Sequence, residues 1–218
     1  MPAIQSTPSI RWPGRAGALL VVAVALAALA LQYLLLIRAT LDTVGPGFAT
    51  VRYFSFFTVL SNLLVVAAAG RAALRGHGDG QLSQPRVQAA VALYIGVTGL
   101  VYVTVLRHLW HPQGLQWWAD CGLHYATPLL YLSWWALVAP HGRLAWRDLP
   151  AWLLFPAGYV LWVFLRGAVV HEYPYPFLDV DQHGWGVVIG NAVVVLGVFV
   201  AVGAVLVGVD RMLGRGRA

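Results

Sequence analysis

The sequence predicts an all-α, polytopic membrane protein, built as a bundle of six transmembrane helices with both termini in the cytoplasm. Hydrophobic residues make up 60% of the 218 residues and charged residues only 10%, with a mean hydropathy of +0.72. This is more apolar than a soluble domain of that size requires. Several apolar runs also approach the roughly 20 residues that cross a bilayer as a helix, and arginine is concentrated in alternate loops, as expected for a multi-pass topology.

The predicted organisation is a disordered cytoplasmic N-terminus at residues 1–15, a membrane domain at 16–210 and a basic cytoplasmic tail at 211–218. Gly- and Pro-rich turn signals separate the apolar segments. A cleaved signal peptide is the alternative for the first segment, but its apolar run is longer than a usual signal core. The six predicted crossings are residues 17–37, 54–74, 87–106, 121–139, 149–165 and 185–209.

The distribution of charge sets the predicted orientation. The chain has 14 arginines and no lysine; ten fall in the terminal segments and in the loops after the second and fourth crossings, and four on the opposite side. The positive-inside bias therefore places both termini in the cytoplasm of a cell membrane. Because the arginines are scattered between apolar segments, they do not form the basic patch of a nucleic-acid-binding protein. The absence of lysine beside abundant Ala, Val, Gly and Arg is associated with GC-rich bacterial genomes.

Two polar residues, Thr58 and His124, each lie about one turn inside a crossing that enters from the non-cytoplasmic side. Polar side chains in membrane helices usually face the interior of a bundle, so the two are expected to meet there. A hydroxyl becomes a nucleophile when a base lies beside it. The alternatives are that Thr58 bonds its own i−4 carbonyl and that His124 is a neutral packed residue. Each residue belongs to a polar helical face, formed by Ser55, Thr58 and Asn62 in one crossing and by Asp120, His124, Thr127 and Tyr131 in the other.

Other polar residues allow more than one interpretation. Asp120 could orient the His124 imidazole or be a hydrated acid favoured at a helix start. Arg166, at the outer end of the fifth crossing, could bind a substrate carboxylate or phosphate or extend to lipid headgroups. Metal binding by His108 and His111 fits known ligand patterns poorly. The glycines of residues 186–190 have the spacing of a close helix contact. No metal and no cofactor are predicted, and the sequence does not decide an oligomeric state.

Three blocks carry a resemblance to a known family. They are the aromatic segment from Tyr53 to Asn62, the segment Leu123-His124-Tyr125-Ala126-Thr127-Pro128, and the run from Gly158 to Val163 together with residues 173–179. These blocks resemble the androgen-induced membrane protein family, which includes androgen-dependent TFPI-regulating protein, and the chain looks closer to a bacterial branch of it. Tyr125 and the displaced Pro128 depart from the family's pattern.

The resemblance implies a multi-helix intramembrane hydrolase of lipid metabolism that cleaves acyl esters, of the fatty-acid ester of hydroxy-fatty-acid type or a related bacterial lipid. It implies a threonine nucleophile and a histidine base, and the matching positions here are Thr58 and His124. Substrate binding is then expected of Asn62, Arg166 and Tyr131 on the polar seam. Two further hypotheses are kept: a lipid-binding or transport protein that cleaves no bond, and a structural membrane protein in which these residues only pack helices.

Overall fold

A computed structural model describes residues 12–75 and 80–215, and every regular element in that part of the chain is helical. Five of the described helices are long and apolar enough to cross a membrane, which fits a multi-pass membrane protein. These are α1 (Trp12–Thr40), α3 (Phe57–Arg75), α4 (Pro85–Thr104), α7 (Leu149–Val170) and α8 (Val180–Arg215). The shorter elements are α2 (Gly45–Phe54), α5 (Leu115–Cys121), α6 (Thr127–Val138), and the single turns η1 (Gln81–Ser83), η2 (Leu106–His108), η3 (Gly122–Ala126), η4 (Trp146–Asp148) and η5 (Pro176–Leu178).

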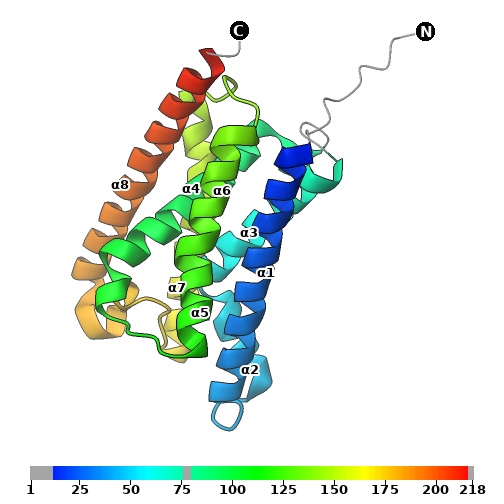
Figure 1. Ribbon diagram of the computed structural model, residues 1–218. Coiled ribbons are helices and arrows are strands. Elements are labelled where there is room, and N and C mark those ends of the chain that lie inside the picture. The colour runs from blue at the N-terminus through cyan, green and yellow to red at the C-terminus, as the bar shows by residue number, and fades with distance from the viewer. Residues whose placement is uncertain (1–11, 76–79, 216–218) are drawn as a thin grey trace.

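The predicted crossing at residues 121–139 is not one regular helix but three contiguous pieces, α5, η3 and α6. The middle piece, η3, is a π-helical turn, and the backbone stays right-handed helical through both of its junctions. None of the three pieces reaches the length of a crossing by itself. Together they run in one line along the bundle beside α1 (Figure 1).

Most predicted boundaries differ from the structure by a few residues, and three of these differences change an assigned region. Helix α1 begins at Trp12, so residues 12–15 are helical and not disordered; the prediction for residues 1–11 lies outside the described part. Helix α8 continues to Arg215, through most of the predicted basic tail, and residues 216–218 lie outside the described part. The second crossing begins at Phe57 and not at residue 54, because α2 ends at Phe54. Hydropathy marks where a segment becomes apolar, whereas helix ends depend on backbone hydrogen bonds.

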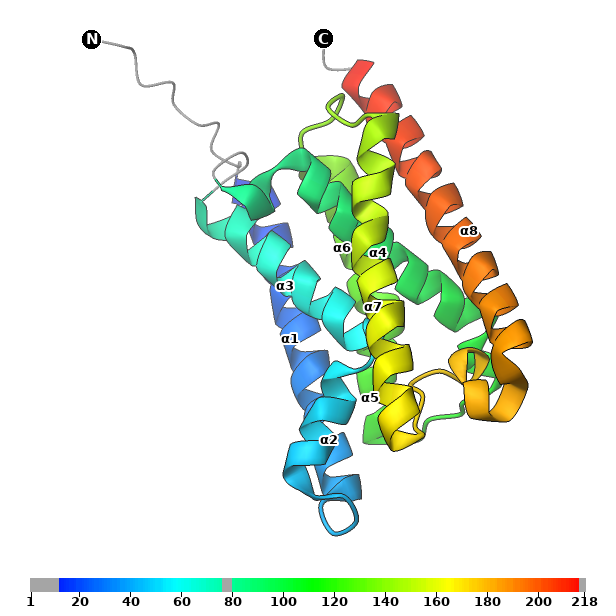
Figure 2. The same ribbon diagram turned by 180° about the vertical axis from the view of Figure 1, so that it is seen from behind.

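Small residues allow the central helices to pack closely. Helix α1 has its most extensive contact with α3, where side chains such as Ala18, Ala25 and Ala68 are fully buried. The glycines at 186 and 190 do not make the predicted close contact, because a Cβ at either position would meet nothing within 4 Å. The start of α1 and the end of α8 lie at the same end of the bundle (Figures 1 and 2).

A buried histidine–aspartate contact fixes that end of α8. Asp210, 1% exposed, accepts hydrogen bonds from the backbone N–H groups of Arg143 and Leu144 at 3.0 and 2.9 Å. The Nδ1 atom of His141 lies 3.3 Å from Asp210 Oδ1, and its Nε2 atom lies 3.0 Å from the carbonyl oxygen of Ala136. This clamp ties α8 to the loop between α6 and α7.

Candidate active site

A break between two helices places Thr58 at the start of α3. Helix α2 ends at Phe54, and the Ser55 carbonyl that follows accepts a hydrogen bond from the phenol of Tyr159 at 2.9 Å instead of from a backbone N–H one turn later. Thr58 is the second residue of α3, where backbone N–H groups lack a partner within the helix. The sequence pattern predicted that Ser55 and Thr58 share one helical face, but the break between α2 and α3 separates them. The face that joins Thr58 to Asn62 is retained.

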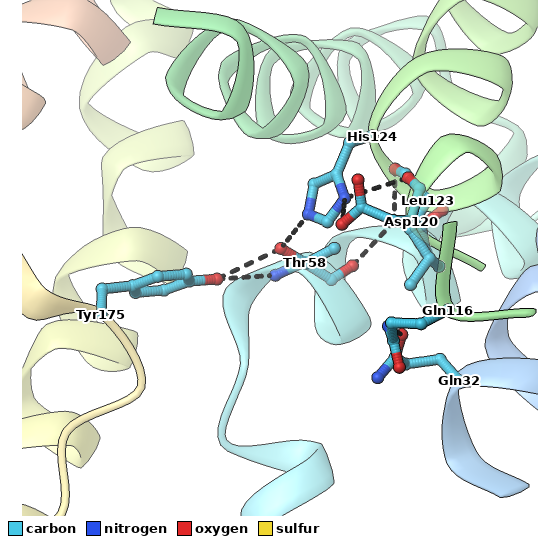
Figure 3. Close-up of polar contacts among 8 residues, drawn as sticks. Gln32, Thr58, Gln116, Asp120, Leu123, His124 and Tyr175 are labelled. Carbon is cyan, nitrogen blue, oxygen red and sulfur yellow. Dashed lines mark hydrogen bonds and ion pairs between the residues drawn. The ribbon is translucent and has the colours of Figure 1, made fainter. Parts of the chain in front are cut away.

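The Thr58 hydroxyl lies between two polar partners from other elements. Its Oγ1 atom is 3.2 Å from His124 Nε2 and 3.2 Å from the Tyr175 hydroxyl, and the Thr58 N–H donates to the same Tyr175 oxygen at 3.2 Å. Figure 3 shows His124 and Tyr175 reaching Thr58 from different directions. The predicted meeting of Thr58 with His124 is thus present, and the hydroxyl has partners other than an i−4 carbonyl.

Asp120 lies on the far side of the His124 ring. The Nδ1 atom of His124 is 3.1 Å from the Asp120 carbonyl oxygen and 3.3 Å from its carboxylate Oδ1. Asp120 is only 5% exposed, so it is not the hydrated acid that was one interpretation of the sequence. Because two acceptors face Nδ1, a proton there leaves the Nε2 lone pair directed at Thr58. Tyr102 stacks on the imidazole with ring centroids 4.1 Å apart.

The π-helical turn accounts for the position of His124. Pro128 has no N–H to donate to the His124 carbonyl four residues earlier, and the N–H of Thr127 bonds instead to the Gly122 carbonyl five residues back. Two glycines make room for the widened turn. A Cβ on Gly122 would lie 2.5 Å from Ala28 Cβ, and one on Gly99 would lie 3.2 Å from the His124 carbonyl oxygen. π-Helical turns occur frequently at functional sites.

Asn62 lies at the site, and its side-chain nitrogen is bonded to the backbone. Its side-chain nitrogen donates to the carbonyls of Thr58, at 2.8 Å, and of Leu123, at 3.3 Å, and the residue is fully buried. Both N–H groups are therefore committed to the backbone. Asn62 thus links the first turn of α3 to η3. It does not line the cavity beside Thr58, and its predicted role in substrate binding stays a prediction.

The other two predicted substrate-binding residues lie away from Thr58. Arg166 bonds through both terminal nitrogens to Glu172, to its carbonyl at 2.9 Å and to its carboxylate. Its two terminal nitrogens are thus already paired, whereas Nε is buried without a hydrogen-bond partner, and Arg166 does not line the cavity beside Thr58. Tyr131 is fully buried and donates to the Gln88 carbonyl at 3.1 Å. Tyr131 therefore packs between α6 and α4, because its hydroxyl is bonded to the backbone of α4.

A cavity of about 370 Å³ opens beside Thr58, between α4, α7 and α8. Its walls are almost entirely apolar, and the lining residues within the described part include no charged side chain. Three of them on α8, Ile189, Val193 and Leu196, are 54%, 62% and 46% exposed, so the cavity reaches the outward surface of that helix. An apolar molecule of lipid character fits such a space.

Tyr175, like Tyr102, is a site residue that sequence reasoning missed. It stands in the loop before α8, is 9% exposed, and lines the cavity with Thr58. Residues 173–176 were treated as a Pro-rich turn and as part of the block that carries the family resemblance. The signal that could have identified it was the family block that contains it. Burial raises the pKa of Tyr175, so the phenol stays protonated and can donate a hydrogen bond at neutral pH.

Within the described residues, no group of three or more His, Cys, Asp or Glu side chains is placed to hold a metal ion. The chain matches none of the family models, curated proteins and solved structures with which it was compared. In the site itself, a hydroxyl contacts an imidazole and the imidazole contacts a carboxylate, next to an apolar cavity. This arrangement can deprotonate the hydroxyl as it attacks an electrophile.

Proposed function

We propose that this protein is an integral membrane hydrolase that cleaves acyl esters of lipids, with Thr58 as nucleophile and His124 as general base. One observation carries the proposal: Thr58 Oγ1 lies 3.2 Å from His124 Nε2, while Asp120 Oδ1 lies 3.3 Å from the other ring nitrogen. The relation of the three groups is that of a hydrolase triad, which is recognised by geometry and not by fold.

The reaction begins when the ester carbonyl reaches Thr58. The Thr58 oxygen bonds to the acyl carbon as its proton passes to His124 Nε2, and the carbonyl π electrons move to the carbonyl oxygen. The tetrahedral intermediate collapses, the alcohol leaves with the proton from His124, and an acyl-threonine remains. Water then attacks, giving its proton to His124, and the Thr58 oxygen recovers that proton as the fatty acid leaves. Positioned acid–base help of this kind contributes about 10²- to 10⁴-fold.

The cavity supports an uncharged substrate with a long hydrocarbon chain. Its lining within the described residues has no cation to pair with a phosphate or free carboxylate, and its wall on α8 is exposed to the surroundings. A lipid ester could therefore enter sideways from the bilayer, between α7 and α8. The proposed substrate is therefore a neutral acyl ester of a lipid. A fatty-acid ester of a hydroxy fatty acid fits only if its free carboxylate stays outside the cavity, because no lining residue in the described part carries a positive charge.

The proposed topology has six crossings with both termini in the cytoplasm. The five long helices supply five crossings, and α5, η3 and α6 together supply the sixth. An even number agrees with the start of α1 and the end of α8 lying at one end of the bundle (Figure 1). The arginine count assigns that end to the cytoplasm, which places Thr58 and His124 near the outer leaflet.

The apolar cavity also suits a second candidate function, lipid binding or transport without bond cleavage. The test is release of fatty acid from para-nitrophenyl esters of graded chain length and from neutral lipid esters, by purified protein in detergent. Wild type should be active, and Thr58→Ala and His124→Ala should fall to background. Thr104→Ala is the matched control, because its hydroxyl bonds the Leu100 carbonyl away from the cavity.

A long-chain fluorophosphonate should label Thr58 in the wild type and not in Thr58→Ala. Lipid retention by Thr58→Ala without any hydrolysis by wild type would favour the binding function instead. Equal fatty acid release by wild type and both variants would remove Thr58 and His124 from the mechanism.

A further inference from the structure

The hydrolase mechanism needs a hydrogen-bond donor for the negative charge that develops on the ester carbonyl oxygen. Such donors are aimed at the position of the oxyanion, and removing one typically costs about 10²- to 10³-fold in kcat. Two of the residues predicted to bind substrate already use most of their donors within the protein. Asn62 donates to two backbone carbonyls, and Arg166 is paired with Glu172.

Few polar groups of the cavity wall can take that role. Thr98 lies 2.9 Å from both the Tyr94 carbonyl and the Ser61 hydroxyl, so its hydroxyl is held within the helices. The phenol of Tyr159 donates to the Ser55 carbonyl at the helix break. Tyr175 differs from both, because its hydroxyl lies 3.2 Å from the attacking atom itself, Thr58 Oγ1.

The direction of the hydrogen bonds leaves the Tyr175 proton free to donate. The Thr58 N–H already donates to the Tyr175 oxygen, so the phenol serves as acceptor in that contact. The Thr58 hydroxyl donates to His124 when the imidazole acts as base. The remaining lone pairs of Thr58 Oγ1 can then accept the O–H of Tyr175, which points the phenolic proton at the reacting centre.

We propose that Tyr175 is a catalytic residue that donates its phenolic O–H to the oxyanion, an inference that rests on the proposed hydrolase function. When the Thr58 oxygen bonds to the acyl carbon, it gives up the lone pair that accepted from Tyr175. The carbonyl oxygen gains charge within reach of the same donor. No proton leaves Tyr175: the phenol exchanges one acceptor for another, and the bond reverts when the intermediate collapses. The Thr58 N–H, at the positive end of the α3 dipole, stands beside it.

The loop that carries Tyr175 is held on both sides. The Tyr175 ring stacks on the Phe177 ring at an interplanar angle of 7°, with the ring centroids 5.4 Å apart. Tyr173 packs on Gly167, where a Cβ would lie 2.2 Å from the tyrosine ring, so only glycine accommodates it. Glu172 bridges Arg52 of α2 and Arg166 of α7. Arg166 thus helps to fix this loop through its bonds to Glu172.

The test compares Tyr175→Phe with Tyr94→Phe, measuring kcat, KM, fluorophosphonate labelling rate and thermal unfolding on para-nitrophenyl decanoate. Tyr94 is the matched control, since it also loses a buried phenol hydrogen bond, to the Trp152 carbonyl, but does not line the cavity. Tyr175→Phe should lower kcat by about 10²- to 10³-fold with little change in KM. Tyr94→Phe should keep its kcat per folded molecule.

A second variant covers the case in which Tyr175→Phe does not fold. A monofluorinated tyrosine at position 175 keeps the hydroxyl and lowers its pKa. Because only the protonated phenol donates, activity should be lost at lower pH on the alkaline side of the kcat profile than in wild type.

The inference is overturned if the kcat of Tyr175→Phe stays within about threefold of wild type, because removing an oxyanion donor costs much more. It is also overturned if the fluorinated tyrosine does not change the pH at which activity is lost on the alkaline side. Both results leave the hydrolase standing. A wild type that neither releases decanoate nor reacts with the fluorophosphonate instead defeats the hydrolase, and the role of Tyr175 with it.

Discussion

Two histidine–aspartate pairs stand near opposite ends of the bundle, with the same separation and different surroundings. The distance from Nδ1 to the carboxylate is 3.3 Å both for His124 with Asp120 and for His141 with Asp210. The side chain of His141 is completely buried, whereas that of His124 is 12% exposed. The second ring nitrogen faces a hydroxyl in the first pair, Thr58, and a backbone carbonyl in the other.

The group facing Nε2 decides what each pair can do. A carbonyl only accepts, so His141 satisfies both of its neighbours when both ring nitrogens carry protons, and no lone pair is left for chemistry. A hydroxyl can donate, so His124 can keep a lone pair at Nε2 and receive a proton from Thr58. A histidine–aspartate pair is therefore not in itself a sign of catalysis.

The strongest test of this difference between the two pairs is to make the same substitution in both. We expect His124→Gln to lower kcat by about 10⁴-fold, because the general base is lost. His141→Gln should keep the activity of each folded molecule, with active molecules counted by fluorophosphonate labelling. Equal specific losses in the two variants would contradict the division into one reactive and one structural pair.

The next largest effect is expected on stability, at the other pair. Asp210→Ala removes the acceptor of two backbone N–H groups and leaves a buried imidazole without its partner. Breaking a buried pair in this way costs about 3–5 kcal/mol. Denaturation in detergent should show the loss, and Asp181→Ala is the control, because its pairing with His171 is exposed. Unchanged stability of Asp210→Ala would refute the clamp.

A smaller effect is expected from Asp120→Asn. The loss of an orienting aspartate in a serine protease triad costs about 10⁴-fold, but here about 10²-fold is expected. The reason is that the Asp120 carbonyl also holds Nδ1, at 3.1 Å, and remains in the variant. The measurement is kcat against pH. A loss as large as that of His124→Gln would mean that the carboxylate alone orients the ring.

The smallest effect is expected from Glu172→Gln, which weakens the bridge between Arg52 and Arg166. Glu172 is 26% exposed, and partly exposed pairs contribute about 1 kcal/mol or less. Loosening the loop of Tyr175 by that amount should reduce kcat by at most about fivefold. Arg38→Gln, whose arginine lies at the end of α1, is the comparison. A complete loss of activity would indicate that Glu172 itself takes part in the reaction.

The apolar helices and the meeting of Thr58 with His124 were predictable because both follow from residue type. A polar side chain inside an apolar helix must face other protein, and two such residues at similar depth were expected to meet. The division of the fourth crossing into α5, η3 and α6 was not predictable from hydropathy, which reports polarity and not hydrogen-bond period. The nearest signal was Pro128, four residues after His124.

The three predicted substrate-binding residues lie outside the cavity lining for a different reason. Asn62, Arg166 and Tyr131 were assigned to substrate because polar groups in an apolar chain suggest function, yet each has a hydrogen-bond or ion-pair partner within the protein. Those partners are mostly backbone carbonyls, which every residue carries and which no sequence pattern marks. Tyr175 was missed for the converse reason: it lies in a loop far along the chain and reaches Thr58 only through tertiary packing.

The widened turn at Gly122–Ala126 makes the length of this segment as important as its composition. A regular α-helix turns by about 100° and rises 1.5 Å for each residue, so removing a single amino acid here would swing the imidazole around the axis and off the threonine. Every side chain of the triad could be kept while the reaction was lost. Two otherwise similar chains that differ by one residue in the length of this segment are therefore expected to differ in whether the imidazole faces the threonine.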